Sequence, residues 1–235
     1  MERPHQPDGS GSAGGLRLSE SEATAQAFYD RWIGGTGLRS RLGRTVFSLS
    51  GTVYSGPFIQ AAALRPEDRV MEIGSGLGEI LTASQRRIGA EQPYFGIDLS
   101  YQMVRRARRG LESRRPSLHF LVASALQMPF RRQCFDVVLL SHVVKYLTDP
   151  QLRQVLAQVK ALLRPGGRLV LWEFRPYAWG PINRIILRGS GSHKLRSAAE
   201  LVALLQEQGF RNLQPFRVHT PWPPFRNLAY RAQAG

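Results

Sequence analysis

The sequence predicts an α/β fold: a doubly wound, seven-stranded, mostly parallel sheet with helices on both faces. The first observation is that short apolar segments alternate with longer segments of helical periodicity from residue 68 onward. Strands that alternate with helices in this way form parallel sheets, because each helix returns the chain to the start of the next strand. The second is that segment 134–142 is nearly all apolar, as expected for a strand covered on both faces.

Turn and capping residues set the limits of the individual elements. The expected strands are 68–74, 93–100, 117–124, 134–142 and 168–174, with two more near 211–218 and 226–231. The expected helices are 77–89, 100–115, 149–164 and 197–209. Asp149 is the expected N-cap of the third helix, with Pro150 at its first position. The Pro-Gly-Gly segment 165–167 predicts a turn, Gly209 a helix end, and the proline-rich segment 220–225 a second turn.

The chain is expected to divide into a tail, a helical cover and a core domain. Residues 1–18 are polar and glycine-rich and predict a flexible tail. Residues 19–64 predict an N-terminal helical cover that begins at a Ser-x-x-Glu spacing, in which more than one serine fits as the cap. Residues 65–235 carry the alternating pattern, interrupted at 175–196 by a lid-like insertion of aromatic and basic residues.

The composition favours a globular, cytoplasmic protein. Hydrophobic residues make up 43% of the chain and charged residues 21%. The N-terminal segment lacks the apolar core of a signal peptide, and no apolar run reaches the roughly 18 to 20 residues needed to cross a bilayer. Cys134 is the single cysteine, which excludes an intramolecular disulfide and a cysteine-rich zinc site. No metal site is expected.

The formal net charge is +15, and nearly all the basic residues are arginine. One interpretation is an anionic partner surface, either a membrane or a nucleic acid. The other is a compositional bias, which the scattering of the arginines along the chain favours. Helix 105–115 and insertion 175–196 each hold several arginines, so both interpretations stay open.

A glycine-rich turn after the first strand indicates a nucleotide-type ligand. Gly74, Gly76 and Gly78 give Gly-x-Gly-x-Gly, whereas a pyrophosphate-binding turn reads Gly-x-Gly-x-x-Gly. Glu79 stands where the third glycine of that fingerprint falls, and Glu72 ends the strand. Two carboxylates beside the turn would repel a diphosphate, so the ligand is expected to be cationic or neutral there.

S-adenosylmethionine fits this turn, because it carries a sulfonium and an ammonium group and no phosphate. Glu72 is expected to attract its ammonium group, and the glycines to let its amino-acid part approach the backbone. Asp98, at the end of the second strand, is expected to accept hydrogen bonds from the ribose hydroxyls.

Five segments resemble the class I S-adenosylmethionine-dependent methyltransferases, within them the small-molecule and lipid-precursor group typified by ubiquinone and menaquinone biosynthesis. These segments read VMEIGSGLG, GIDLS, ASALQMPF, FDVVLLSHVVKYL and LLRPGGRLVLWEF. The resemblance implies the Rossmann-like class I methyltransferase fold for residues 65–235, with S-adenosyl-L-methionine as cofactor.

The resemblance also implies further contacts. Ser124 stands where relatives often carry an acidic residue for the adenine amino group, and Leu126 and Met128 fit either the adenine pocket or the core. Ser141 is expected near the methyl end of the cofactor, and Tyr29 on a helix that closes over it. The residues expected to bind the cofactor are Glu72, Gly74, Ser75, Gly76, Gly78, Asp98, Leu99, Ser124, Ala125, Leu126, Ser141 and Tyr29.

The expected function is methyl transfer to an O, N or C atom of a small-molecule or lipid-like acceptor. A general base is needed only if the acceptor arrives protonated. His142 is the best-placed candidate, at a strand end where ligands of such sheets bind; His193, Glu173 and Tyr177 are the others. The alternatives are an RNA or other nucleic-acid methyltransferase, favoured by the charge, and a non-catalytic methyltransferase-like binding protein.

Overall fold

The fold is described from a computed structural model of the 235-residue chain. The described residues are 18–34, 37, 45, 55–111, 117–177, 180–181, 183–184, 187, 192–218 and 227–235. The predicted tail lies outside them except for Leu18, as does the predicted turn 220–225. Much of the predicted cover 19–64 and part of the predicted insertion 175–196 also lie outside them.

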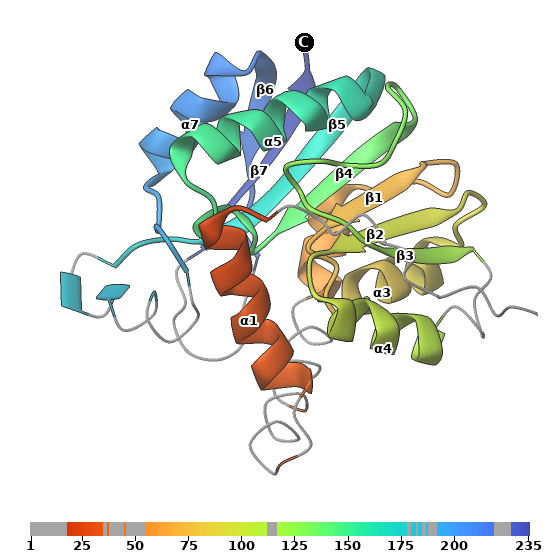
Figure 1. The fold of residues 1–235 in the computed structure, drawn as a ribbon. Helices are drawn as coiled ribbons and strands as arrows, with labels where there is room; N and C mark the ends of the chain where they lie inside the picture. Colours follow the sequence, from red (N-terminus) through yellow and green to blue (C-terminus); the bar gives the residue numbers. More distant parts are fainter. Residues whose placement is uncertain are drawn as a thin grey trace, which may run out of the picture.

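Within the described residues, one seven-stranded sheet forms the centre of the molecule (Figure 1). Its strands are β1 Val70–Ile73, β2 Tyr94–Asp98, β3 Leu118–Val122, β4 Phe135–Ser141, β5 Leu163–Phe174, β6 Phe210–Pro215 and β7 Asn227–Ala234. Their order is β3-β2-β1-β4-β5-β7-β6, and only β7 pairs antiparallel, with β5 and β6. The predicted doubly wound, mostly parallel sheet of seven strands is confirmed.

Helices cover both faces of this sheet. They are α1 Glu20–Gly34, an unlabelled helix at 55–62, α3 Glu79–Ile88, α4 Tyr101–Leu111, the short η2 Val144–Tyr146, α5 Asp149–Leu162 and α7 Ala198–Glu207. Figure 1 shows α5 and α7 on one face, with α3 and α4 on the other. Helix α1 lies against α4 and η2 rather than on either face alone. None of the described helices is long and apolar enough to span a bilayer.

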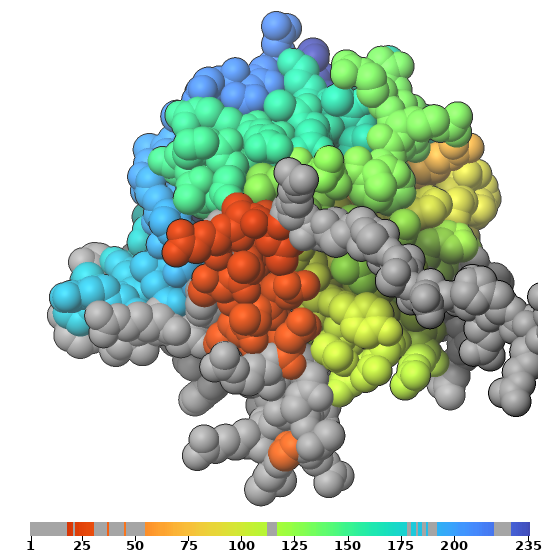
Figure 2. Space-filling view, in the orientation of Figure 1, coloured from red at the N-terminus to blue at the C-terminus, as the bar shows by residue number. Residues whose placement is uncertain are grey.

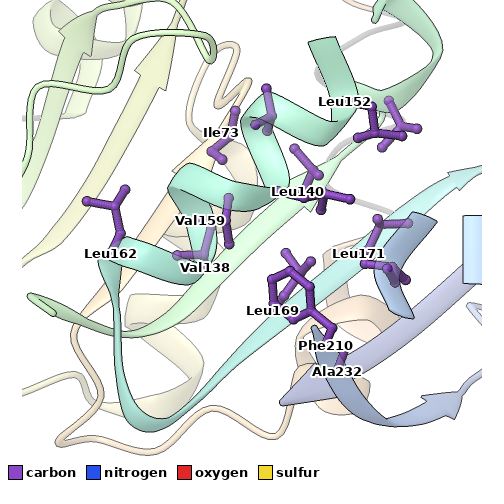
Figure 3. Close-up of a cluster of buried hydrophobic side chains, with 14 of the residues drawn as sticks. Ile73, Val138, Leu140, Leu152, Val159, Leu162, Leu169, Leu171, Phe210 and Ala232 are labelled. Carbon is purple, nitrogen blue, oxygen red and sulfur yellow. The ribbon is translucent and has the colours of Figure 1, made fainter. Parts of the chain in front are cut away.

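Alternation along β4 divides the core into two clusters. Val138 and Leu140 face the cluster beneath α5 and α7 (Figure 3). Val137 and Leu139 face the other cluster, which α4 and the helix at 55–62 also supply. Burying both faces of a strand requires apolar residues at successive positions, which explains the nearly continuous apolar run.

Two local predictions were wrong. The N-cap of α5 is Thr148 and not Asp149, because the Thr148 hydroxyl accepts from Gln151 N while Asp149 pairs with Arg196 at 2.6 Å. The turn predicted at 165–167 lies inside β5, which starts at Leu163. There the pairing with β4 is irregular and Gly166 has a φ of 78°.

Candidate functional site

The predicted site residues converge on one edge of the sheet. Strands β1 to β5 are parallel, so their carboxyl ends meet at this edge, where ligands of doubly wound sheets bind. The glycine turn follows β1, Asp98 ends β2, Ser124 follows β3 and His142 follows β4. Helix α1 crosses the same edge and contacts the segments that follow β2, β3 and β4.

The turn after β1 is held against β2 by its backbone. Gly74 N and Ser75 N both donate to Ile97 O, at 2.8 and 3.0 Å. Gly74 and Gly78 have φ angles of 73° and 82°, which side chains rarely tolerate. A Cβ on Gly74 would also overlap the Val143 side chain. At Gly78 it would lie 2.5 Å from Phe120 Cζ. The protein's own packing therefore requires these two glycines, and their predicted role beside a ligand stays a prediction.

Asp98 ties this turn to the end of β2. Its Oδ2 accepts from Gly76 N at 2.9 Å, and its Oδ1 accepts from Ser100 N at 2.8 Å. Burial raises the pKa of Asp98 to about 6, although both backbone hydrogen bonds favour the charged form. The carboxylate is thus fixed in place, with lone pairs left for hydroxyl donors.

Glu72 is a buried carboxylate with an unsatisfied oxygen. It is 1% exposed, and its Oε2 has no hydrogen-bond partner among the described residues. Burial, followed by the nearby charges of Glu79 and Asp98, raises the pKa of Glu72 well above its usual range. An acidic cluster of this kind favours a cationic ligand. No metal-binding group of histidine, cysteine or acidic residues occurs within the part of the chain that the structure describes.

His142 has an unusual backbone and a confined ring. Its φ is 57°, in the left-handed region that non-glycine residues seldom adopt. The ring lies 4.3 Å from that of Trp172 and 4.4 Å from that of Phe174. Burial lowers the pKa of His142 below its usual value, so the imidazole is neutral at neutral pH. Nδ1 lies 3.5 Å from Glu173 Oε1, too far for a well-formed hydrogen bond.

A buried ion pair supports this histidine. The side chains of Lys145 and Glu173 are 3% and 2% exposed, and their charged groups approach to 3.5 Å. Lys145 Nζ also donates to His142 O, and Glu173 Oε2 accepts from Lys145 N at 3.0 Å. Burial alone would raise the pKa of Glu173, but Lys145 and His142 outweigh it and lower the pKa to about 2. Glu173 is therefore ionised, but a carboxylate with so low a pKa is a weak base, so the sequence-based role of general base does not suit it.

The known proteins that this chain is similar to include methyltransferases. Residues 70–167 match the family model described as a methyltransferase domain. The ubiquinone/menaquinone biosynthesis C-methyltransferase of Vibrio vulnificus is 28% identical over 147 residues, 62% of this chain and 55% of that protein. The demethylmenaquinone methyltransferase of Thermus thermophilus is 33% identical over 119 residues, 50% of this chain and 52% of that protein. Over these residues the chain is similar to methyltransferases.

Solved structures show the same class I methyltransferase fold. Human N-acetylserotonin methyltransferase has a TM-score of 0.71 at 16% identity, with 90% of this chain and 60% of that chain covered. Magnesium protoporphyrin IX methyltransferase from Synechocystis has a TM-score of 0.67 at 18% identity, with 92% and 100% covered. The chain spans about half the length of the curated relatives it matches.

The remaining predicted cofactor residues lie along the edge of the sheet from β3 to η2. Ser141 is buried at the end of β4. The Tyr29 hydroxyl lies 2.5 Å from that of Tyr146, which joins α1 to η2. Ala125, Leu126 and Met128 pack on the core cluster under α5, which supports a core role for them and leaves the adenine role a prediction.

The other candidate bases have structural contacts. His193 N donates to Lys145 O at 2.7 Å, and Tyr177 N donates to Asn183 Oδ1 at 2.8 Å. Sequence reasoning missed Lys145, although a lysine inside the apolar run FDVVLLSHVVKYL was a usable signal. It also assigned no ligand role to Glu22, whose Oε1 accepts from Ser124 Oγ. The Ser-x-x-Glu spacing explained that glutamate as part of a helix cap.

Proposed function

We propose that this protein is a class I methyltransferase that uses S-adenosylmethionine to methylate a small-molecule or lipid-like acceptor. The observation that supports it is the unpaired, buried Glu72 oxygen beside the glycine turn, with Asp98 one strand away. A buried carboxylate without a cation is unfavourable, and a ligand ammonium would satisfy it. The cofactor would supply a methyl group already activated by the sulfonium.

The residues present fit this cofactor. Glu72 would hold the ammonium group, and Asp98 would accept from the ribose hydroxyls without giving up its backbone hydrogen bonds. Tyr29 and the rest of α1 would cover the bound molecule from the side opposite the sheet. The glycine turn would orient its backbone towards the amino-acid part.

The acceptor would meet the cofactor at the end of β4. We assign His142 the role of general base for an acceptor that arrives protonated, because its neutral ring is held between Trp172 and Phe174. The insertion 175–196 would contribute to acceptor selection. The quinone methyltransferases named above support a small-molecule acceptor and do not favour a nucleic acid. We further propose that the exposed arginines contact an anionic membrane surface.

Thermal melting of the full chain tests cofactor binding. S-adenosylmethionine and S-adenosylhomocysteine should raise the melting temperature, because a ligand that binds only the folded state stabilises it, and NAD should not. Asp98→Asn should weaken S-adenosylhomocysteine binding by about tenfold to a hundredfold. Asp136→Asn, the same change beside Arg164 at the opposite edge of the sheet, is the control. Stabilisation by NAD alone would overturn the proposal.

A second arm of the same experiment separates binding from turnover. His142→Asn removes the base while asparagine tolerates the left-handed backbone. It should keep the thermal shift and lower transfer of labelled methyl groups to acceptors in cell extract by about a hundredfold or more. Unchanged transfer would remove His142 from the mechanism.

A further inference from the structure

Helix α1 brings a buried carboxylate to the edge of the sheet where the cofactor is proposed to bind. Glu22 is 8% exposed. Its Oε2 accepts from the backbone nitrogen and the hydroxyl of Ser19, at 2.9 and 2.8 Å, which completes the cap of α1. Its Oε1 instead accepts from Ser124 Oγ, across 102 residues of chain. One carboxylate oxygen thus caps the helix, and the other accepts a hydrogen bond from the turn after β3.

The position of Glu22 follows from the strand register. Asp98 pairs with Val122 at the ends of β2 and β3, and Ala123 N donates to Asp98 O at 3.1 Å. Ser124 therefore lies one strand beyond Asp98, on the side away from β1. A nucleoside whose sugar is held at β2 and whose amino-acid end is held at β1 extends its base towards β3. The base then reaches the place where Glu22 meets Ser124.

Other contacts keep this part of α1 on the edge. Gln26 Nε2, one turn after Glu22, donates to Leu99 O at 3.0 Å, and Gln151 Nε2 donates to Ser19 Oγ at 2.9 Å. In Figure 2, α1, in red, lies against α4, in yellow-green, in agreement with their contacts. The carboxylate is therefore held by contacts on both sides of it along the helix.

The charge of Glu22 lacks a cationic partner. No lysine or arginine among the described residues pairs with it, and its donors are two hydroxyl groups and a backbone amide. A buried carboxylate needs strong donors, and the exocyclic amino group of adenine is such a donor. A carbonyl oxygen in the same position would be repelled.

We propose that Glu22 is a specificity-determining residue that recognises the 6-amino group of the cofactor's adenine. This inference rests on the proposed function. In this proposal, a carboxylate on α1 recognises the adenine with the support of Ser124, and the turn after β3 does not do so by itself. The alternative is that Glu22 only caps α1. In that case its substitution would not change the relative affinity for ligands that differ at the 6-position of the purine.

Binding of two ligands to the full chain tests this proposal. S-adenosylhomocysteine carries the amino group, and S-inosylhomocysteine carries a carbonyl oxygen in its place. Wild-type protein should bind S-adenosylhomocysteine at least about tenfold more tightly than S-inosylhomocysteine. With S-inosylhomocysteine one charge-assisted hydrogen bond is lost, and the carbonyl oxygen is repelled by the carboxylate. Glu22→Gln should lose or reverse this preference, because an amide can donate to the carbonyl oxygen.

The controls separate recognition from capping. Gln suits the capping position as well as Glu, so Glu22→Gln should melt close to the wild-type temperature without ligand. Glu20→Gln makes the same charge change at an exposed site on the same helix and should keep the wild-type preference. Ser124→Ala leaves the cap untouched and should lower the preference in the same direction as Glu22→Gln.

The outcomes are distinguishable. A full preference for S-adenosylhomocysteine in both Glu22→Gln and Ser124→Ala would overturn this inference and leave the proposed function standing. Failure of wild-type protein to bind either ligand would overturn the proposed function, and this inference with it.

Discussion

At the residue scale, the site holds buried carboxylates in opposite electrostatic states. No cation from the part of the chain that the structure describes lies beside Glu72, and burial raises its pKa well above the usual range. Glu173 lies beside Lys145 and His142, and its pKa falls to about 2 in spite of burial. In the proposed function, the ammonium group of the ligand would complete the first arrangement, whereas the second is already complete and fixes the surroundings of His142.

Removing one partner of the complete pair should strongly destabilise the protein. Glu173→Gln leaves the Lys145 ammonium buried without its counter-charge, so we expect a loss of about 3 to 5 kcal/mol in the free energy of unfolding. Adding Lys145→Met should recover part of that loss. Denaturant unfolding of the two variants and the wild type measures both effects. A double variant as unstable as Glu173→Gln would contradict this account.

The same pair sets a pH dependence whose sign is fixed. The folded-state pKa of Glu173 is lowered from 4.5 to about 2, so the carboxylate contributes stability above its unfolded pKa. That contribution should be lost as the pH falls from about 4.5 towards about 2. Glu173→Gln should show a smaller fall in melting temperature over this range than the wild type.

At the scale of elements, alternation of apolar and helical segments was enough to predict the sheet. The predicted boundary of a helix was wrong where two neighbouring residues could both act as its cap. Thr148 and Asp149 are both good capping residues, and the choice depended on Arg196, which is distant in sequence. The contact of α1 with Ser124 could not be predicted from the sequence either. The Ser19-x-x-Glu22 spacing predicts a helix cap, but it does not indicate which part of the protein the helix packs against.

The cap of α5 gives a prediction at this scale. Thr148→Ala removes the hydroxyl that accepts from Gln151 N, so we expect α5 to lose about 1 kcal/mol of stability. Thr148→Ser keeps an acceptor and should stay close to the wild type. Urea unfolding compares them; an alanine variant as stable as the serine variant would show that the cap contributes little.

At the scale of the whole molecule, part of the positive charge lies away from the site. Arg86 and Arg87 occupy the last turn of α3, and Arg108 and Arg109 that of α4. Both helices run back from the carboxyl edge of the sheet, so these exposed arginines lie towards its amino-terminal edge. Arginine at a helix C-terminus also suits the helix dipole, which gives the charge a local reason.

Vesicle binding tests whether that charge meets an anionic surface. The wild-type chain should sediment with vesicles of anionic lipid at low salt and less so as salt shortens the screening length from about 10 Å to about 3 Å. Replacing all four arginines with glutamine should reduce this binding and leave the affinity for S-adenosylhomocysteine unchanged. Neutral vesicles are the control. Equal binding by both proteins would exclude this surface.

The single antiparallel strand has a consequence for assembly of the chain. Since β7 lies between β5 and β6, neither β6 nor the cover that α7 gives it can join the sheet before residues 227–234 are in place. A chain cut after residue 218 would keep its glycine turn and yet present β5 as an open template for other chains. We expect such a shortened chain to aggregate during synthesis, so that its insolubility would be seen before any loss of activity could be measured.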